Sequence, residues 1–146
     1  MQIEIKIDPD CREPKLVLVT DKITDEVNEI LKKLSVDSPK VITGFREDVA
    51  EIIDPANIYR FYASNGKVYA TTTQGDFTLR IRLYEIEENL KLPGFVRISN
   101  SEMINLKKVK NFDLSFTGTI CVTLLDGTTT YVSRRYVPRI KKLLGI

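Results

Sequence analysis

The chain has 146 residues, 42% hydrophobic and 29% charged, which is typical of a globular protein with room for one medium-sized domain. It contains no histidine and only two cysteines, which excludes histidine-based nucleophile pairs, histidine-containing zinc sites and a disulfide framework. The net charge of +2 is unevenly distributed, because residues 1–54 carry −5 and residues 55–146 carry +7, and this asymmetry indicates a polyanionic partner for the second part.

The N-terminal residues carry no recognisable export signal. Residues 2–7 alternate polar and apolar side chains, and they lack the basic start and the apolar stretch of a signal peptide. Apolar runs elsewhere are only a few residues long, whereas a membrane-spanning helix needs about 20 apolar residues. We therefore expect a cytoplasmic protein.

The first 39 residues are expected to form two strands and one helix. Alternating and β-branched side chains predict strands over residues 3–7 and 16–19. Thr24 is expected to cap a helix that ends at the serine and proline of residues 38–39. The apolar residues that recur at helical spacing in this segment are Val27, Ile30, Leu31 and Leu34.

A turn marks the expected boundary between two parts of the chain. Residues 40–45 and 49–53 are short strand candidates, and the sequence DPAN at residues 54–57 is typical of a turn. The chain is therefore expected to divide into a small βα extension, residues 1–53, and a second domain, residues 54–146.

Beyond this turn nearly every segment has the pattern of a strand. Residues 58–62 and 68–72 are β-rich and are separated by Asn65-Gly66, which is a strong signal for a tight hairpin. A second turn at residues 74–76 leads into the strand of residues 77–79. The further strands are expected over residues 95–98, 103–106, 109–112, 119–124 and 129–132.

Two short helices complete the predicted fold. One is expected over residues 83–90, where a proline and a glycine just beyond it stop the helix, and the other over about residues 135–143. The fold class is therefore mostly β, and α+β overall. We expect the core to contain Phe61, Tyr69, Phe77, Phe95, Ile104 and Val122, and both cysteines, Cys11 and Cys121, to be buried thiols.

The most informative motif is FVRISNSEMINLKKV at residues 95–109, followed by LDG at 125–127 and VSRR at 132–135. This pattern resembles the LytTR DNA-binding domain of bacterial regulators, and the resemblance extends over roughly residues 54–146. The chain departs from the family pattern at Ser99, where many members carry histidine, and at Glu102, where an aromatic or hydrophobic residue is common.

The resemblance implies a fold of several small β-sheets whose loops enter successive major grooves of double-stranded DNA. It also implies that the protein recognises direct repeats and binds them as a homodimer on DNA. Residues 1–53 resemble the extension of stand-alone LytTR regulators, which lack a receiver domain. For such regulators, the resemblance implies restraint by a small membrane protein that acts as an inhibitor.

Four residues are expected to contact bases. Arg135 offers a fork that fits guanine O6 and N7, and the Asn100 amide fits adenine N6 and N7. The family also uses the loop between the first two strands, which here makes Asn65 and Lys67 candidates. The residues expected to contact phosphates are Arg97, Ser101, Lys107, Lys108, Lys110 and Arg134.

Each candidate also has a purely structural interpretation. Asn65 fits a type I′ turn, the lysines fit a solvated surface, and Arg97 could pair with a carboxylate. Asn105 could bond only to backbone across a strand end. Asn100 could cap a turn, and Arg135 could form a salt bridge at the start of a helix.

Three other functional classes compete with DNA binding. An enzyme is disfavoured because adjacent carboxylates such as Glu87 and Glu88 point apart on a helix and accompany no catalytic motif. An interaction module that docks an acidic protein onto the basic second part is the main alternative. RNA binding is third, because the chain lacks the aromatic strand and the GxxG loop of common RNA-binding modules.

Overall fold

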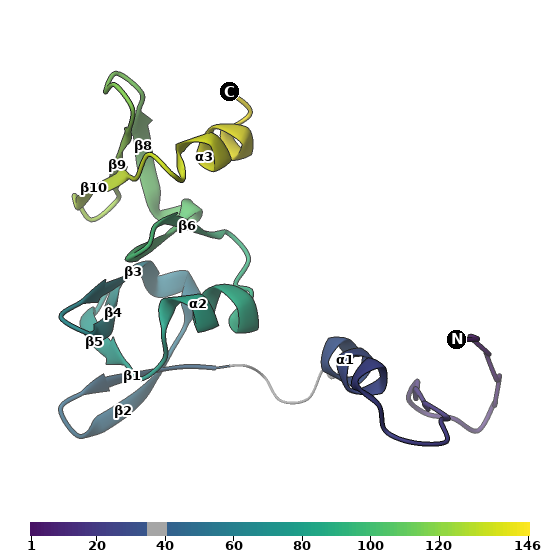
Figure 1. The fold of residues 1–146 in the computed structure, drawn as a ribbon. Helices are drawn as coiled ribbons and strands as arrows, with labels where there is room; N and C mark the ends of the chain where they lie inside the picture. Colours follow the sequence, from purple (N-terminus) through teal and green to yellow (C-terminus); the bar gives the residue numbers. More distant parts are fainter. Residues whose placement is uncertain (35–40) are drawn as a thin grey trace. The chain divides into compact units, whose positions relative to one another are not determined.

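The computed structural model describes residues 1–34 and 41–146, in two compact units, Met1–Pro39 and Lys40–Ile146 (Figure 1). The expected helix end at residues 38–39 lies outside the described residues. Within the described ranges, no helix is long and apolar enough to cross a membrane.

The first unit contains helix α1, Asp25–Leu34. The Val27 N–H donates to Thr24 Oγ1 at 3.3 Å, which confirms the predicted cap. The strands expected over residues 3–7 and 16–19 are wrong, because both segments are extended but belong to no sheet among the described residues. A strand needs a hydrogen-bonded neighbour, and alternation alone does not supply one. Cys11 is exposed, so its expected burial is also wrong.

The second unit is built on a seven-stranded antiparallel sheet with the order β2-β1-β5-β4-β3-β7-β6. Strands β3, β4 and β5 form where β-branched or aromatic residues recur on one buried face, because such side chains fit a pleated surface. The strands are β1 Ile42–Arg46, β2 Val49–Ile53, β3 Ile58–Ser64, β4 Lys67–Thr72, β5 Gly75–Leu79, β6 Phe95–Ser99 and β7 Glu102–Asn105.

The hairpin β1–β2 belongs to the second unit, although the sequence places residues 40–53 with the N-terminal extension. Phe45 of β1 pairs with Thr78 of β5, and Ile42 and Ile53 are buried in the core of the sheet. The physical reason is the packing at Gly44. This residue lacks a side chain, so β1 packs directly against Phe77 of β5. The turn signal at residues 54–57 is present as a short 3-10 turn, Pro55–Asn57, inside the unit.

The hairpin β3–β4 confirms the Asn-Gly signal. Asn65 has φ 51° and Gly66 has φ 75°, the two positive values that a type I′ turn requires. Beyond β5, helix α2, Leu83–Glu85, continues as the wider turn Ile86–Leu90 and stops at Lys91, where φ is 43°. The predicted helix over residues 83–90 is therefore present.

A three-stranded sheet with the order β10-β9-β8 and helix α3 complete the unit. The strands are β8 Val109–Asp113, β9 Ile120–Leu124 and β10 Thr129–Val132. Helix α3 spans Val137–Leu144 and begins two residues later than expected, so Arg135 lies in the turn before it. Figure 1 shows α3 beside the strands of this sheet.

Two apolar clusters hold the second unit together. One lies under β1–β5 and α2 and contains Phe61 and Phe77, and the other joins β6 and β7 to the three-stranded sheet and contains Ile104 and Val122. Tyr69 and Phe95 are only half-buried, while Cys121 is buried as predicted. The mostly β fold class is confirmed. Because β6–β7 contributes to both clusters, the turn of this hairpin is fixed relative to both sheets.

Candidate nucleic-acid interface

The turn between β6 and β7 presents Asn100 to solvent on a rigid support. Arg97 holds the backbone of this turn with two hydrogen bonds. Its Nε donates to the Ser99 carbonyl at 2.8 Å, and its Nη2 donates to the Asn100 carbonyl at 2.6 Å. The Ala63 N–H donates to the Ser101 carbonyl at 2.8 Å, which ties the turn to the end of β3. The Asn100 backbone is therefore fixed while its side chain stays exposed.

Arg97 has an internal role in this structure. Its side chain is 11% exposed, and its Nη1 lies 3.8 Å from Glu87 Oε1. The alternative interpretation, in which Arg97 pairs with a carboxylate, is confirmed. Its expected phosphate contact stays a prediction, and it would require the guanidinium to leave these partners.

The turn between β10 and α3 lies against the β6–β7 turn. The Ser133 N–H donates to the Ile98 carbonyl at 2.9 Å, and the Tyr136 hydroxyl lies 3.5 Å from Asn100 Oδ1. Arg135, between these two anchors, is exposed, and no hydrogen bond, ion pair or ring contact engages its guanidinium within the described residues. The structure thus brings Asn100 and Arg135 to one end of the second unit, with both side chains exposed.

The β3–β4 turn reaches the same end. Lys67 and Asn100 both line an open hollow of about 570 Å³. Asn65 sits beside them in the positive-φ turn conformation, and both turn residues are exposed. Three turns from distant parts of the sequence therefore converge, and each carries a predicted base-contacting residue.

Two arginines that sequence reasoning missed line this hollow as well. Arg80 and Arg82 follow β5, and both are exposed. The Arg80 guanidinium carbon lies 3.9 Å from the centroid of the Phe45 ring, which orients it. The alternation in the sequence LRIRL, residues 79–83, was the available signal, because period-2 spacing puts both arginines on one face.

The lysines lie at the opposite end of the β6–β7 hairpin. Lys107 and Lys108 belong to the 3-10 turn Leu106–Lys108 after β7, and Lys110 follows on β8. Strand β7 separates them from Asn100, which corresponds to roughly 15 Å of extended chain. Lys108 Nζ lies 5.5 Å from the centroid of the Tyr59 ring, and the Lys107 and Lys110 side chains are exposed.

Asn105 and Arg134 are the remaining residues that the sequence analysis singled out. The buried Asn105 amide donates to the Ile58 carbonyl at 2.9 Å, so its structural interpretation is confirmed. Arg134 is exposed, and its guanidinium packs over Gly118 in the loop between β8 and β9. That loop follows Asp113, the last residue of β8, whose pKa is lowered because the Ser115 hydroxyl and N–H both donate to its carboxylate.

Comparisons with known proteins show the family of this chain. The profile of the LytTr DNA-binding domain family matches residues 49–145. The chain is 31% identical, over 100% of its length and 99% of the other, to an uncharacterized HTH-type transcriptional regulator of Staphylococcus aureus strain NCTC 8325, and equally to one of strain MSSA476.

A solved structure has the same fold. It is the LytTr DNA-binding domain of a methyl-accepting/DNA response regulator from Bacillus cereus, which superimposes with a TM-score of 0.70 at 23% identity. The match covers 75% of this chain and 100% of that domain. By its sequence profile and its fold, the chain belongs to the LytTR family of DNA-binding domains.

Proposed function

We propose that this protein is a transcription regulator that recognises a specific sequence of double-stranded DNA through three turns. The observation that carries the proposal is the convergence of Asn100, Arg135 and the β3–β4 turn at one end of the second unit. Each turn is short enough to approach base edges in a major groove, which is about 12 Å wide.

Arg135 and Asn100 have the chemistry of direct base reading. The unengaged Arg135 guanidinium fits guanine O6 and N7 with two parallel hydrogen bonds, and no other side chain offers this fork to guanine. The Asn100 amide fits adenine, and its orientation is set by Tyr136. Asn65 and Lys67 supply a third contact from the neighbouring turn.

Phosphate contacts flank the base-reading end. Ser101 and Arg134 are adjacent to Asn100 and Arg135 in sequence, and Arg80 and Arg82 line the hollow beside them. The second group of cations is Lys107, Lys108 and Lys110. Strand β7 separates them from Asn100 by roughly 15 Å, and this spacing fits phosphates on the far side of a groove. Arg97 acts mainly by holding the Asn100 turn.

Two copies act together on DNA in this proposal, one on each direct repeat, and they do so in the cytoplasm. The N-terminal unit is the candidate for joining the copies. Helix α1 exposes Leu31 by 47% and Leu34 by 49%, and these residues form an apolar stripe with Val27 and Ile30. Two such helices in antiparallel orientation would bury the stripe between them.

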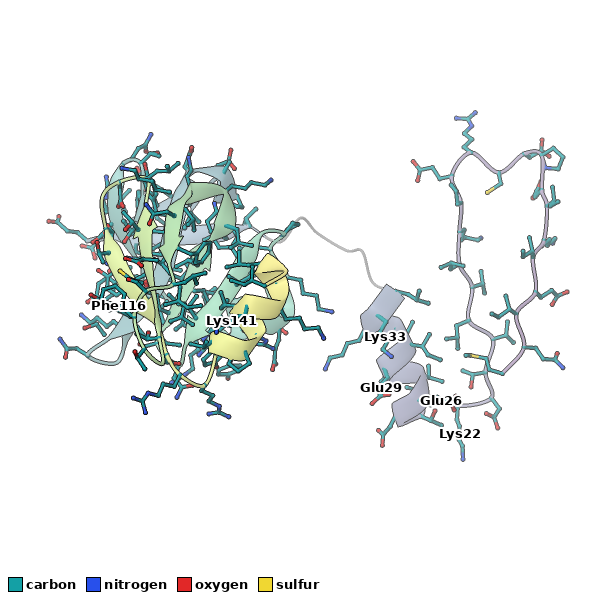
Figure 2. All side chains as sticks on the ribbon, turned by 90° about the horizontal axis from the view of Figure 1, so that it is seen from above. Lys22, Glu26, Glu29, Lys33, Phe116 and Lys141 are labelled. Carbon is teal, nitrogen blue, oxygen red and sulfur yellow. The ribbon has the colours of Figure 1, made fainter. Side chains whose placement is uncertain are left out.

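Charge favours a second copy of α1 as the occupant of this stripe. Glu26 and Lys33 are seven residues apart, so they lie on the same side of the helix, and Figure 2 labels both on α1. Antiparallel pairing therefore brings Glu26 of one copy to Lys33 of the other, twice per dimer. A membrane protein that covers this same unit could restrain the regulator by preventing the pairing.

The test is selection of duplexes from a random-sequence pool by the purified protein, followed by footprinting on the enriched duplex. We expect enrichment of a motif that occurs twice in the same orientation, with both copies protected on one face of the DNA. Enrichment of no sequence, together with binding to an acidic protein such as a polyglutamate-tagged carrier, would instead favour the interaction module.

A further inference from the structure

A buried carboxylate joins the two sheets behind the base-reading turns. Glu102 is the first residue of β7, two residues after Asn100, and it is 9% exposed. Its Oε2 accepts from Arg60 Nη1 at 3.3 Å, and its Oε1 accepts from Thr130 Oγ1 at 2.7 Å. The two oxygens of one side chain are thus bonded to β3 in one sheet and β10 in the other.

The partners of Glu102 are themselves held in place. The Arg60 guanidinium carbon lies 4.4 Å from the centroid of the Tyr62 ring, and its Nε lies 3.4 Å from Thr71 Oγ1. Thr130 lies on β10, which pairs with β9 and leads directly into the turn that carries Arg135. A buried carboxylate with fixed partners is a stiff connection, because moving Arg60 would leave the charge without a counter-charge and moving Thr130 would leave one oxygen without its donor.

We propose that Glu102 is a positioning residue, which sets the distance between Asn100 and Arg135 through its bond to Thr130. The inference rests on the proposed function, since it concerns how the base-reading turns are aligned. Asn100 is two residues before Glu102, and Arg135 is five residues after Thr130. Glu102 is buried, so it aligns groups that contact DNA without contacting DNA itself.

The Ser133–Ile98 hydrogen bond is a second connection between the β6–β7 hairpin and the segment that runs from β10 to α3. It ties the backbone of the β10–α3 turn to β6 at 2.9 Å. The apolar cluster around Ile104 and Val122 holds the two sheets together, and the two polar connections at different points set their fine alignment. Base reading requires alignment to within about 0.5 Å, so loss of one connection should affect selective binding first.

The decisive variant is Thr130→Val, which removes the hydroxyl but keeps the β-branched shape. The protein is measured on the duplex that the wild type enriches from a random pool and on a scrambled duplex of the same length. We expect Thr130→Val to weaken binding to the enriched duplex about tenfold and to leave the scrambled duplex unchanged. Thr130→Ser, which restores the hydroxyl, should recover most of the lost affinity.

Matched controls separate positioning from general stability. Thr129→Val removes a hydroxyl from the adjacent, exposed position of β10 and should change neither affinity. Glu102→Met removes both bonds and should have an effect at least as large as Thr130→Val. If Glu102→Met fails to fold, the comparison of Thr130→Val with Thr130→Ser decides the question.

A background variant shows whether Thr130 acts through the base-reading residues. In a protein that already carries Asn100→Ala and Arg135→Lys, Thr130→Val should have no further effect on the enriched duplex. The proposal is wrong if Thr130→Val weakens both duplexes equally, weakens neither, or keeps its full effect in that background. A wild-type protein that binds both duplexes equally would instead refute the proposed function, and the inference with it.

Discussion

The Asn100 amide owes its position to two neighbours that do not themselves need to touch DNA. Arg97 holds the backbone of the turn, and the Tyr136 hydroxyl lies at hydrogen-bond distance from Oδ1. Fixing the amide in advance lowers the entropy that is lost when it binds a base. Under the proposed function, these two supporting residues therefore contribute to recognition by keeping the amide in place.

The contribution of Tyr136 can be measured by Tyr136→Phe. Loss of its hydroxyl should weaken binding to the selected duplex by about 0.5 kcal/mol, the low end for a hydrogen bond, because 3.5 Å is a long contact. Titration of a labelled duplex gives the affinity. Tyr131→Phe is the matched control, since Tyr131 is exposed on β10, and it should bind like the wild type. Equal losses in both variants would remove Tyr136 from this role.

The lysines should contribute charge without sequence preference. If Lys107, Lys108 and Lys110 each neutralise one phosphate, alanine at all three should reduce the slope of log affinity against log salt by about 3. The affinities for the selected and scrambled duplexes should fall by the same factor. The measurement is a salt titration of binding for both duplexes. A slope that does not change would mean that these lysines are only a solvated surface.

The sequence was most informative for exposed polar side chains. The motif around residues 95–101 predicted Asn100, and the VSRR segment predicted Arg135, and both side chains are exposed in neighbouring turns. The internal bonds of Glu102 could not be predicted, because its partners Arg60 and Thr130 are distant in sequence and depend on how the strands pair. Arg80 and Arg82 alternate with apolar residues in the sequence, but the hollow that they line is formed with residues of distant segments, so their place in the interface could not be predicted.

At the scale of elements, the strands, the tight hairpin and the short helices of the second unit follow from local pattern. The strand predictions are wrong where strand formation depends on pairing with another strand. Residues 3–7 alternate like a strand but have no partner strand among the described residues. The β1–β2 hairpin is the opposite case. It was recognised as strands, yet its place in the sheet depends on the contacts of Gly44, Ile42 and Ile53.

The packing of this hairpin can be tested by Gly44→Ala. A Cβ at this position would overlap the Ile53 side chain and would lie 2.7 Å from Phe77 Cβ. Such overpacking should lower the free energy of unfolding by about 1–3 kcal/mol. Urea denaturation measures the change. Ala50→Ser, at an exposed position of the same hairpin, should change stability by less than about 0.5 kcal/mol. A stable Gly44→Ala protein would mean that the hairpin is only loosely attached.

At the scale of the whole molecule, the chain combines an acidic N-terminal segment with a basic DNA-binding unit. Under the proposed function, this division assigns pairing to the acidic N-terminal helices and DNA binding to the basic unit. It also explains why net charge alone was uninformative. The chain as a whole carries only +2, while residues 55–146 carry +7.

Antiparallel pairing of α1 predicts a charge-swap rescue. Glu26→Lys and Lys33→Glu should each weaken self-association, because each places like charges opposite one another twice per dimer. The double variant restores opposite charges and should recover the wild-type dimer. Light scattering over a range of protein concentrations measures the oligomeric state. Monomers for all four proteins, or a double variant as weak as the singles, would contradict antiparallel pairing.

The central claim is that this protein reads bases through its turns, and Arg135→Lys tests it most directly. Lysine keeps the charge but loses the two-pronged fork, so binding to the selected duplex should weaken by about 1–3 kcal/mol while binding to a scrambled duplex barely changes. Arg134→Lys, at the neighbouring exposed position, should cost only about 0.3 kcal/mol on either duplex. Equal losses for the two variants on the selected duplex, or no loss for either, would contradict the claim.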